Sequence, residues 1–344
     1  MRKDQIELYI EGLKRINENI PTNFPHKSKK RCFHPLIILR AFYYSLLHVK
    51  YLNLNQRLYL ASNIIYMCNI VYEINSHRFD KIKRYICFFQ EQGIDNLLTQ
   101  YFNKKGSLTI SFSEAPLFRW ENNIPIDIIH FEIFESKKYI CWSEYTIEEF
   151  RKAGIANDRL FLGGYLKNNT IKEFKKNNIF KRCLVLLCRD IYSESNIHLI
   201  DMLSKLSNKH EFSFKLHPSS NYMFYKDYIE KRNMNIIVST KSLKECLDNN
   251  EFDFGISVNS TTYYDVLLSG IPCFRYFDNT FDIMKGYDED IFSNLKELET
   301  IISKCKHSDI NQYCNKMSSI LSYALGYGIN NYKAINFIKL SNNE

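Results

Sequence analysis

The sequence is poor in residues that interrupt or crosslink a fold. Its 344 residues include only 11 Gly, 7 Pro and 2 Trp, which excludes a collagen-like repeat and a glycine- or proline-rich disordered chain. Ten cysteines are present, but none forms a C-x-x-C pair, and the closest two, Cys183 and Cys188, flank an apolar run. Zinc ribbons, thiol redox motifs and a disulfide framework are therefore not expected.

Long apolar runs are also missing. A membrane-spanning helix needs about 18–20 uncharged apolar residues, and the nearest stretch, 35–49, is interrupted by Arg40 and His48. The N-terminal MRKDQIELYIEGLKRI has the pattern of an amphipathic helix and lacks the apolar core of a secretion signal. We therefore expect a cytoplasmic protein with reduced thiols.

The remaining composition is that of an ordinary globular protein, with 45% hydrophobic and 24% charged residues. The length fits one large domain or two ordinary ones. Lys and Arg number 46 against 38 Asp and Glu, a formal net charge of +8. Such an excess suits a phosphate, a nucleotide or an acidic membrane surface, and falls short of the charge of a dedicated nucleic-acid binder.

Short apolar runs alternate with helix-length patterns through the second half of the chain. The predicted strands are 183–188 (CLVLLC), 212–216 (FSFKL), 236–238, 252–258 (FDFGISV) and 272–277 (PCFRYF). Helices are predicted at 195–208, 221–232, 242–249 and 261–269. This spacing predicts a doubly wound parallel sheet, and the continuous apolar strands predict that both faces are covered.

The first half shows a similar alternation after an ambiguous helical region at 1–80. Strands are predicted at 85–89, 108–112, 139–142 and 160–162, with helices at 94–102 and 146–153. Residues 167–181 are polar and charged, as in a linker. We expect an N-terminal Rossmann-like domain at 1–170, a second at 171–310 and a helical segment at 311–344. Ligands of such sheets bind at the carboxyl ends of the strands, so the two sheets should face a central cleft.

The first candidate site is Lys215-Leu216-His217-Pro218-Ser219-Ser220, directly after the strand FSFKL. Pro218 would fix the turn, and Ser219 and Ser220 could cap the next helix and present its amides to an anion. A histidine at this strand end could donate a hydrogen bond or a proton to a departing phosphate. A surface histidine in a capped turn would give the same pattern.

The second candidate site begins where the strand FGISV ends, at Asn259-Ser260-Thr261-Thr262. Hydroxyls and free amides at a helix start can hold a phosphate, and we assign Ser260, Thr261 and Thr262 to that role. Asp265 follows one turn later and would cap amides or reach a sugar hydroxyl. The alternative is a well-capped core helix.

The order of the two motifs is more specific than either one. FKLHPSS is followed about forty residues later by ISVNSTTYYDVLLSGIPCFRY, which resembles the C-terminal half of GT-B glycosyltransferases. The likeness is greatest to bacterial sialyltransferases, Kdo transferases and glycerophosphotransferases of teichoic acid synthesis. YICWSEYTIEEFRKAGIANDRLFLGGYLKNN resembles the end of a GT-B N-terminal domain. The resemblance covers residues 85–280 and implies two Rossmann-like domains and a nucleotide donor, commonly a cytidine nucleotide.

The resemblance also implies roles for single residues. His217 and the hydroxyl cluster would bind the donor phosphate, and Glu114, which follows the strand LTISF, matches in order the acidic base of the sialyltransferases. Ala115 and Pro116 depart from the family's acidic-acidic-glycine pattern, so Glu114 is equally explained as a cap; Asp127 and Glu144 are the other acidic candidates. Arg189, at the end of CLVLLC, would contact the phosphate or form a surface salt bridge.

These residues predict an inverting, metal-independent glycosyltransferase that moves a sugar from a nucleotide-sugar donor, CMP-linked by preference, to a glycan or glycolipid of a bacterial capsule or lipooligosaccharide. No cofactor is expected. Asp288-Glu-Asp290 resembles a metal-binding D-x-D but lies in a polar stretch that we interpret as a solvated turn, and no P-loop or G-x-G-x-x-G is present. The basic loop 26–31 and the segment 40–57 could contact the inner membrane surface or only water. Two alternatives stay open: transfer of a polyol phosphate, and a silent nucleotide-binding subunit of a polysaccharide assembly complex.

Overall fold

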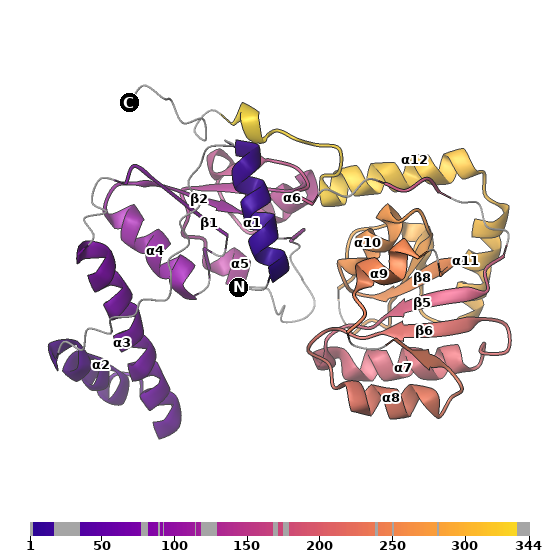
Figure 1. Cartoon of the computed structure of the whole chain (residues 1–344), viewed down its shortest axis with the longest axis horizontal. Coiled ribbons are helices and arrows are strands. Elements are labelled where there is room, and N and C mark those ends of the chain that lie inside the picture. Colours follow the sequence, from indigo (N-terminus) through magenta and orange to yellow (C-terminus); the bar gives the residue numbers. More distant parts are fainter. Residues whose placement is uncertain are drawn as a thin grey trace.

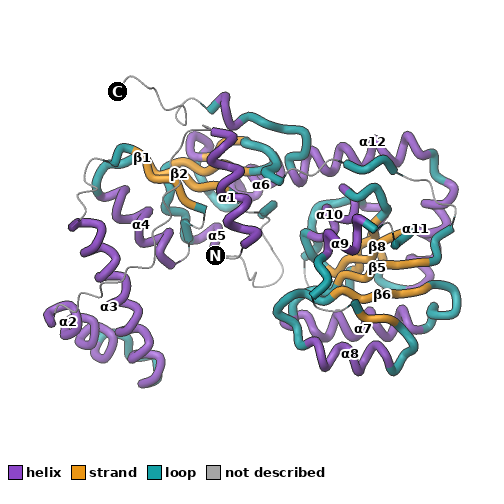
Figure 2. The backbone as a smooth tube through the Cα atoms, viewed as in Figure 1, coloured by secondary structure: helices purple, strands orange, loops and turns teal. Residues whose placement is uncertain are grey.

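The computed structural model describes most of the chain. The described residues are 3–16, 35–76, 82–88, 90–91, 93–113, 115–117, 129–167, 171–174, 179–237, 240–249, 251–280 and 282–335. They form two parallel α/β sheets with helices around them (Figures 1 and 2). The predicted fold class is therefore confirmed.

The first sheet has four parallel strands in the order β1-β2-β3-β4. Their bounds are β1 Arg84–Cys87, β2 Leu108–Phe112, β3 Lys138–Cys141 and β4 Leu160–Leu162. The connecting helices are α4 (Gly93–Lys104), α5 (Ile129–Glu132) and α6 (Glu144–Lys152). The start of α6 is fixed locally, because the Ser143 side chain accepts a hydrogen bond from the Thr146 backbone N–H.

The second sheet has six parallel strands in the order β10-β9-β8-β5-β6-β7. Their bounds are β5 Arg182–Leu186, β6 Glu211–Lys215, β7 Asn235–Ile236, β8 Phe254–Val258, β9 Cys273–Tyr276 and β10 Ile291–Phe292. The helices that follow are α7 Ser193–Ser204, α8 Tyr222–Glu230, α9 Leu243–Asp248, α10 Thr262–Leu268 and α11 Leu295–His307.

The middle of the second sheet is fully buried, as its continuous apolar strands predict. β5 lies between β6 and β8, and Leu184 and Val185, whose side chains point to opposite faces, are both 0% exposed. Each face of a sheet covered by helices must be apolar, so alternation disappears from the sequence. The core therefore sits on both sides of the strands whose carboxyl ends carry the two predicted motifs.

The C-terminal part of the chain returns to the first sheet. After α12 (Ile310–Ile320), a π-helical turn, Leu321–Leu325, brings Tyr323 to α6, where its hydroxyl donates to Glu148 at 2.6 Å. Gly326 has φ 76° and lies against the Trp142 carbonyl, so only glycine fits there. Figure 1 shows α12 crossing between the two sheets. The sequence predicted a helix here but not its return.

Three helices precede the first sheet. α1 (Lys3–Ile16) packs beside the returning chain, with the Arg15 guanidinium donating to the carbonyls of Tyr165 and Leu166. α2 (Pro35–Leu47) and α3 (Leu54–Ser76) form a hairpin that stands away from the sheet (Figure 1). No helix among the described residues is long and apolar enough to cross a membrane.

The predicted strands and helices of the two sheets are found with boundary shifts of at most four residues, and β10, α5 and α11 were not predicted. β10 has two residues and α5 has four, too few to show a periodic pattern. The predicted linker at 167–181 separates the two sheets in sequence. The domain limits at 170 and 310 remain the boundaries that we propose.

Candidate functional site

The strand order of the second sheet locates its binding edge. From β5 the chain moves outward to β6 and β7, then crosses to the other side of β5 for β8, β9 and β10. The direction therefore reverses between β5 and β8. In doubly wound sheets ligands bind outside the carboxyl ends of the strands at such a point, so the loops that follow β5, β6 and β8 form the candidate site.

The loop after β5 is held by one buried side chain. Asn196 in α7 is 0% exposed. Its Oδ1 accepts a hydrogen bond from the Cys188 backbone N–H at 3.1 Å. Its Nδ2 donates to the Cys188 carbonyl at 3.0 Å and to the Tyr225 hydroxyl. This amide fixes the backbone just before Arg189, whose side chain is exposed. Asn196 was not among the predicted site residues, although an asparagine inside a predicted helix is a signal of side-chain-to-backbone bonding.

The loop after β6 forms the turn that Pro218 predicts. The Ser220 backbone N–H donates to the His217 carbonyl at 2.9 Å, with Pro218 at the second turn position that its fixed φ favours. Lys215 is the half-buried last residue of β6. The predicted cap is wrong, because Asn221, rather than Ser219 or Ser220, caps α8 by accepting the Phe224 N–H.

Ser219 instead orients the histidine. Its backbone N–H donates to His217 Nδ1 at 3.2 Å, and its hydroxyl oxygen lies 2.8 Å from the same atom. A backbone N–H can only donate, so Nδ1 is the acceptor in the neutral ring and the proton lies on Nε2. His217 is half-buried. A donor fixed at Nε2 is what binding of a phosphate oxygen requires.

The loop after β8 has a strained backbone and an internally bonded hydroxyl cluster. Asn259 has φ 36°, a region that residues other than glycine rarely occupy. Ser260 Oγ accepts from the Thr262 hydroxyl at 2.9 Å and lies 3.4 Å from the Thr262 N–H. Thr261 is exposed and makes no side-chain cap of α10. The cluster adjoins the β5 loop, since Cys188 Sγ lies 3.6 Å from the Asn259 carbonyl.

Asp265 has a different partner from those predicted for it. Its carboxylate lies 3.6 Å from the Lys167 ammonium, across the segment that joins the two sheets. Burial raises the pKa of the Asp265 carboxyl, and Lys167 opposes that rise. The side chain is 25% exposed, so it is within reach of solvent but is already paired.

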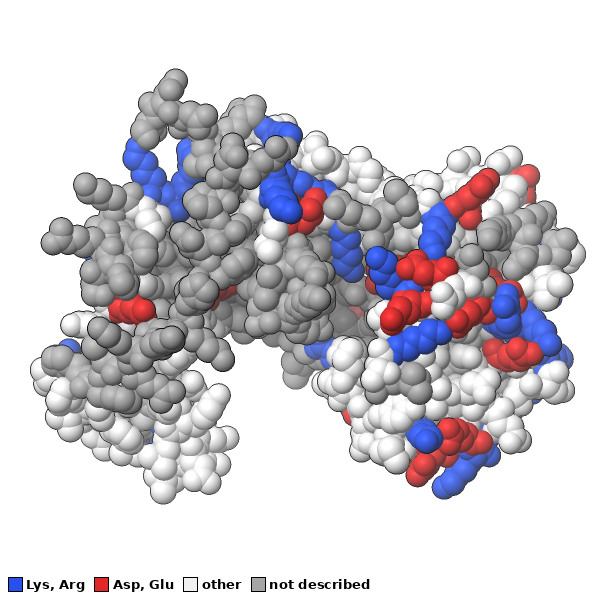
Figure 3. Space-filling model, in the orientation of Figure 1, with Lys and Arg blue, Asp and Glu red and all other residues white. Residues whose placement is uncertain are grey.

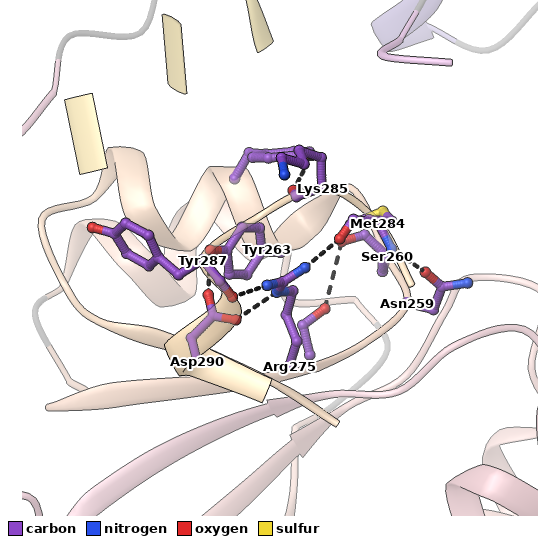
Figure 4. A network of polar contacts seen from close by, with 10 residues as sticks. Asn259, Ser260, Tyr263, Arg275, Met284, Lys285, Tyr287 and Asp290 are labelled. Carbon is purple, nitrogen blue, oxygen red and sulfur yellow. Dashed lines mark hydrogen bonds and ion pairs between the residues drawn. The ribbon is translucent and has the colours of Figure 1, made fainter. Parts of the chain in front are cut away.

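A buried ion pair supports the β8 loop from below (Figure 4). Arg275 in β9 is 3% exposed and Asp290 is 4% exposed; Arg275 Nε donates to Asp290 Oδ1 at 2.6 Å, and the guanidinium also donates to the carbonyls of Met284 and Tyr287. The Met284 N–H in turn donates to Asn259 Oδ1 at 3.3 Å. The network thus joins β9 to the strained residue of the site.

This network corrects the prediction of a solvated turn at 288–290 for its last residue, Asp290, whereas Glu289 is exposed as predicted. Asp290 is buried, and the Tyr263 hydroxyl donates to it at 2.5 Å. Burial raises the pKa of the Asp290 carboxyl to about 6, against the lowering effect of Arg275 and Tyr263. Sequence spacing could not reveal this because its partners lie on other elements.

Two of the three acidic residues predicted as the acceptor base lie outside the residues that the structure describes. Glu114 and Asp127 lie outside the described residues. Glu144 is exposed at the first position of α6.

The first sheet also has a buried pair that was not predicted from the sequence. Glu91 lies in the loop after β1, and its Oε1 is 2.9 Å from Nδ1 of His130 in α5. Both side chains are at most 6% exposed. Among the described residues, no three His, Cys, Asp or Glu side chains gather as a metal site requires.

No protein-family model matches the chain, and no curated protein matches its sequence. Solved structures do match. TarM superposes with a TM-score of 0.53 at 14% identity, covering 80% of this chain and 58% of TarM, so the chain spans about three fifths of that protein.

Two further matches extend over nearly the whole chain. S. aureus MnaA in complex with UDP gives a TM-score of 0.54 at 9% identity and covers 97% of this chain and 92% of MnaA. A putative UDP-N-acetylglucosamine 2-epimerase from Listeria monocytogenes gives 0.50 at 11% identity, covering 87% and 91%. Likeness at these identities establishes the fold: the chain has the GT-B architecture of two parallel α/β sheets.

Proposed function

We propose that the chain is a GT-B-type glycosyltransferase that moves a sugar from a nucleotide-linked donor to a hydroxyl of a bacterial surface glycan. One observation carries the proposal: His217 lies at the carboxyl end of β6 with its Nδ1 occupied by the Ser219 N–H, so that Nε2 is a fixed donor beside the switch point of the sheet. The matched structure of S. aureus MnaA contains UDP, which supports a nucleotide as the ligand of this chain.

The chemistry follows from charge development. As the bond between the sugar carbon and the phosphate oxygen breaks, its electron pair stays on the phosphate. Nε2–H of His217 stabilises that charge, with hydroxyls of Ser260, Thr261 and Thr262 and the exposed Arg189 as further donors. Lys215, Pro218, Ser219 and Ser220 complete the donor side as the loop that holds the histidine. We assign inversion without an essential metal.

The acceptor hydroxyl needs a base from the first sheet, and we keep Glu114 in that role. The bond from the acceptor oxygen to the sugar carbon forms as the proton passes to the Glu114 carboxylate. Asp265 is assigned to a sugar hydroxyl, with Lys167 as its partner. We favour a CMP-linked donor and a capsule or lipooligosaccharide acceptor, with the protein in the cytoplasm at the inner face of the membrane.

A panel of CMP-, CDP-, UDP- and GDP-linked donors, incubated with the full chain and followed by mass spectrometry of the nucleotide products, tests the proposal. Wild-type protein should release one nucleotide. His217→Ala should lower that rate about 10²–10³-fold, the usual loss for one donor aimed at developing charge. The matched control is His307→Ala, which removes an exposed histidine at the end of α11 and should change nothing.

Each other outcome identifies a different function. Transfer of glycerol phosphate from CDP-glycerol would indicate a polyol-phosphate transferase. Interconversion of UDP-sugar epimers without transfer would match the activity named for the Listeria structure. Tight nucleotide binding without turnover would indicate a silent subunit, and full activity in His217→Ala would show that the site is wrong.

A further inference from the structure

The α2–α3 hairpin exposes an unusual amount of apolar surface. The described residues include seventeen exposed large hydrophobic side chains, and twelve of them lie between Leu36 and Tyr72. Exposed apolar residues scattered singly are normal on a protein surface, but a contiguous patch of them marks an interaction site. This surface lies far along the chain from the loops of the candidate site and is not needed for the proposed reaction.

On α2 four of the six exposed large hydrophobic residues form one stripe. Leu36, Leu39, Tyr43 and Leu47 are 56%, 66%, 61% and 55% exposed, and their spacing of three and four residues puts them on one face of the helix. The side that meets α3 is different, because small residues such as Ala41 are fully buried there. The stripe therefore points away from the partner helix.

α3 continues the surface. Leu58, Tyr59 and Tyr66 are 42%, 72% and 55% exposed. Tyr59 and Tyr66, seven residues apart, lie on one face of the helix, and Tyr59 also lines a shallow hollow with Leu52 and Leu60. α3 packs only partly, against α2 and α4, so part of its apolar surface stays uncovered.

The charge of the hairpin is mostly positive. Arg40, Lys50 and Arg57 are its basic residues, and Glu73, in the last turn of α3, is its one acidic residue. Arg40 and Lys50 are exposed, and Arg57 donates to the carbonyls of Leu46, Lys50 and Leu52, which ties the turn between the helices together. Figure 3 shows this lobe as a broad uncharged surface, in contrast to the mixed charges of the second sheet's lobe. The basic loop at 26–31 lies outside the described residues.

We propose that the α2–α3 hairpin docks on the surface of an anionic lipid bilayer, with the stripe of Leu36, Leu39, Tyr43 and Leu47 at the level of the headgroups. Leucine side chains enter the acyl boundary, and tyrosine rings are suited to the interface, where one end is apolar and the other wet. Arg40 and Lys50 then meet lipid phosphates. Two copies of the hairpin would instead bring the three basic residues of each copy together against a single carboxylate in each, Glu73. The hairpin would lie on the bilayer, because neither helix has the length and hydropathy of a membrane span.

Vesicle sedimentation of the full chain tests the docking surface without any need for transfer activity. The protein should pellet with vesicles of phosphatidylcholine mixed with phosphatidylglycerol, and about tenfold less with phosphatidylcholine alone. Leu39→Ser with Leu47→Ser should lower the affinity for the mixed vesicles by about tenfold or more. Arg40→Gln with Lys50→Gln should weaken binding and reduce its dependence on salt.

The matched control replaces two equally exposed apolar residues elsewhere, Ile179→Ser with Met223→Ser, which are 67% and 63% exposed. It should bind vesicles as wild type does. Circular dichroism melts establish that all three double variants are folded. The proposal is overturned if wild type does not pellet with anionic vesicles, or if Leu39→Ser with Leu47→Ser loses no more binding than Ile179→Ser with Met223→Ser. It is also overturned if sedimentation equilibrium shows a dimer that only Leu39→Ser with Leu47→Ser dissolves.

Discussion

Replacing Asn196 tests whether one buried amide holds the loop at the switch point. Asn196→Ala removes three hydrogen bonds and leaves the Cys188 N–H, the Cys188 carbonyl and the Tyr225 hydroxyl without that partner. Cys188 is 7% and Tyr225 1% exposed, so water cannot readily replace the amide. Each unsatisfied buried group costs roughly 1–3 kcal/mol. Since the loop can relax in part, we expect a loss of about 3–5 kcal/mol in the free energy of unfolding.

Denaturant unfolding measures this loss, and an asparagine in solvent provides the comparison. Asn294 also accepts a backbone N–H, that of Glu297 at the start of α11, but its bond is exposed. Asn294→Ala should therefore cost only about 1 kcal/mol, the usual value for a helix cap. If Asn196→Ala costs no more than Asn294→Ala, with an unchanged denaturant slope, the amide does not hold the loop as argued.

A chemically matched variant separates shape from hydrogen bonding. Asn196→Asp keeps the acceptor for the Cys188 N–H but places an oxygen opposite the Cys188 carbonyl. It should be as unstable as Asn196→Ala at neutral pH and should recover on acidification, when the carboxyl can donate. Both variants should weaken nucleotide binding in calorimetry, because Arg189 follows the displaced residue. Wild-type nucleotide affinity in an unstable Asn196→Ala would refute the link between this loop and the site, though not the hydrogen-bond argument.

Two further predictions concern the rest of the fold. Gly326→Ala places a Cβ 1.7 Å from the Trp142 carbonyl at φ 76° and should lower the free energy of unfolding by more than about 3 kcal/mol in a thermal melt. Gly328→Ala, at φ 80° with no atom within 4 Å, should cost only about 1–2 kcal/mol. Equal losses would mean that the returning chain does not press on the Trp142 backbone. The raised pKa of Asp290, about 6 against 3.8, favours its protonated form in the native state, so the free energy of unfolding should fall by roughly 3 kcal/mol as the pH rises from about 4 to above 6. Asp290→Asn should abolish that part of the pH dependence, and a profile identical to wild type would contradict the burial argument.

Much of the candidate site follows from local sequence. β2 and β4 have the predicted bounds, because an apolar run between turn residues specifies a buried strand without reference to its neighbours. The turn at Pro218 and the position of His217 at the end of β6 follow from the fixed φ of proline. The identity of the cap at α8 does not, because Ser219, Ser220 and Asn221 are all good caps, and the choice depends on His217 Nδ1 engaging Ser219.

Tertiary structure alone decided which strand ends meet and which polar groups are paired. The reversal between β5 and β8 depends on pairings between residues about seventy positions apart, and the Asn196 clamp, the Asp290–Arg275 pair and the Glu91–His130 pair all join separate elements. Composition and periodicity describe each segment by itself, so they determined two parallel α/β sheets, the strand ends and their hydroxyl and histidine motifs. Contacts distant in sequence determined how those ends are held, where the C-terminal chain returns, and which face of the α2–α3 hairpin remains exposed.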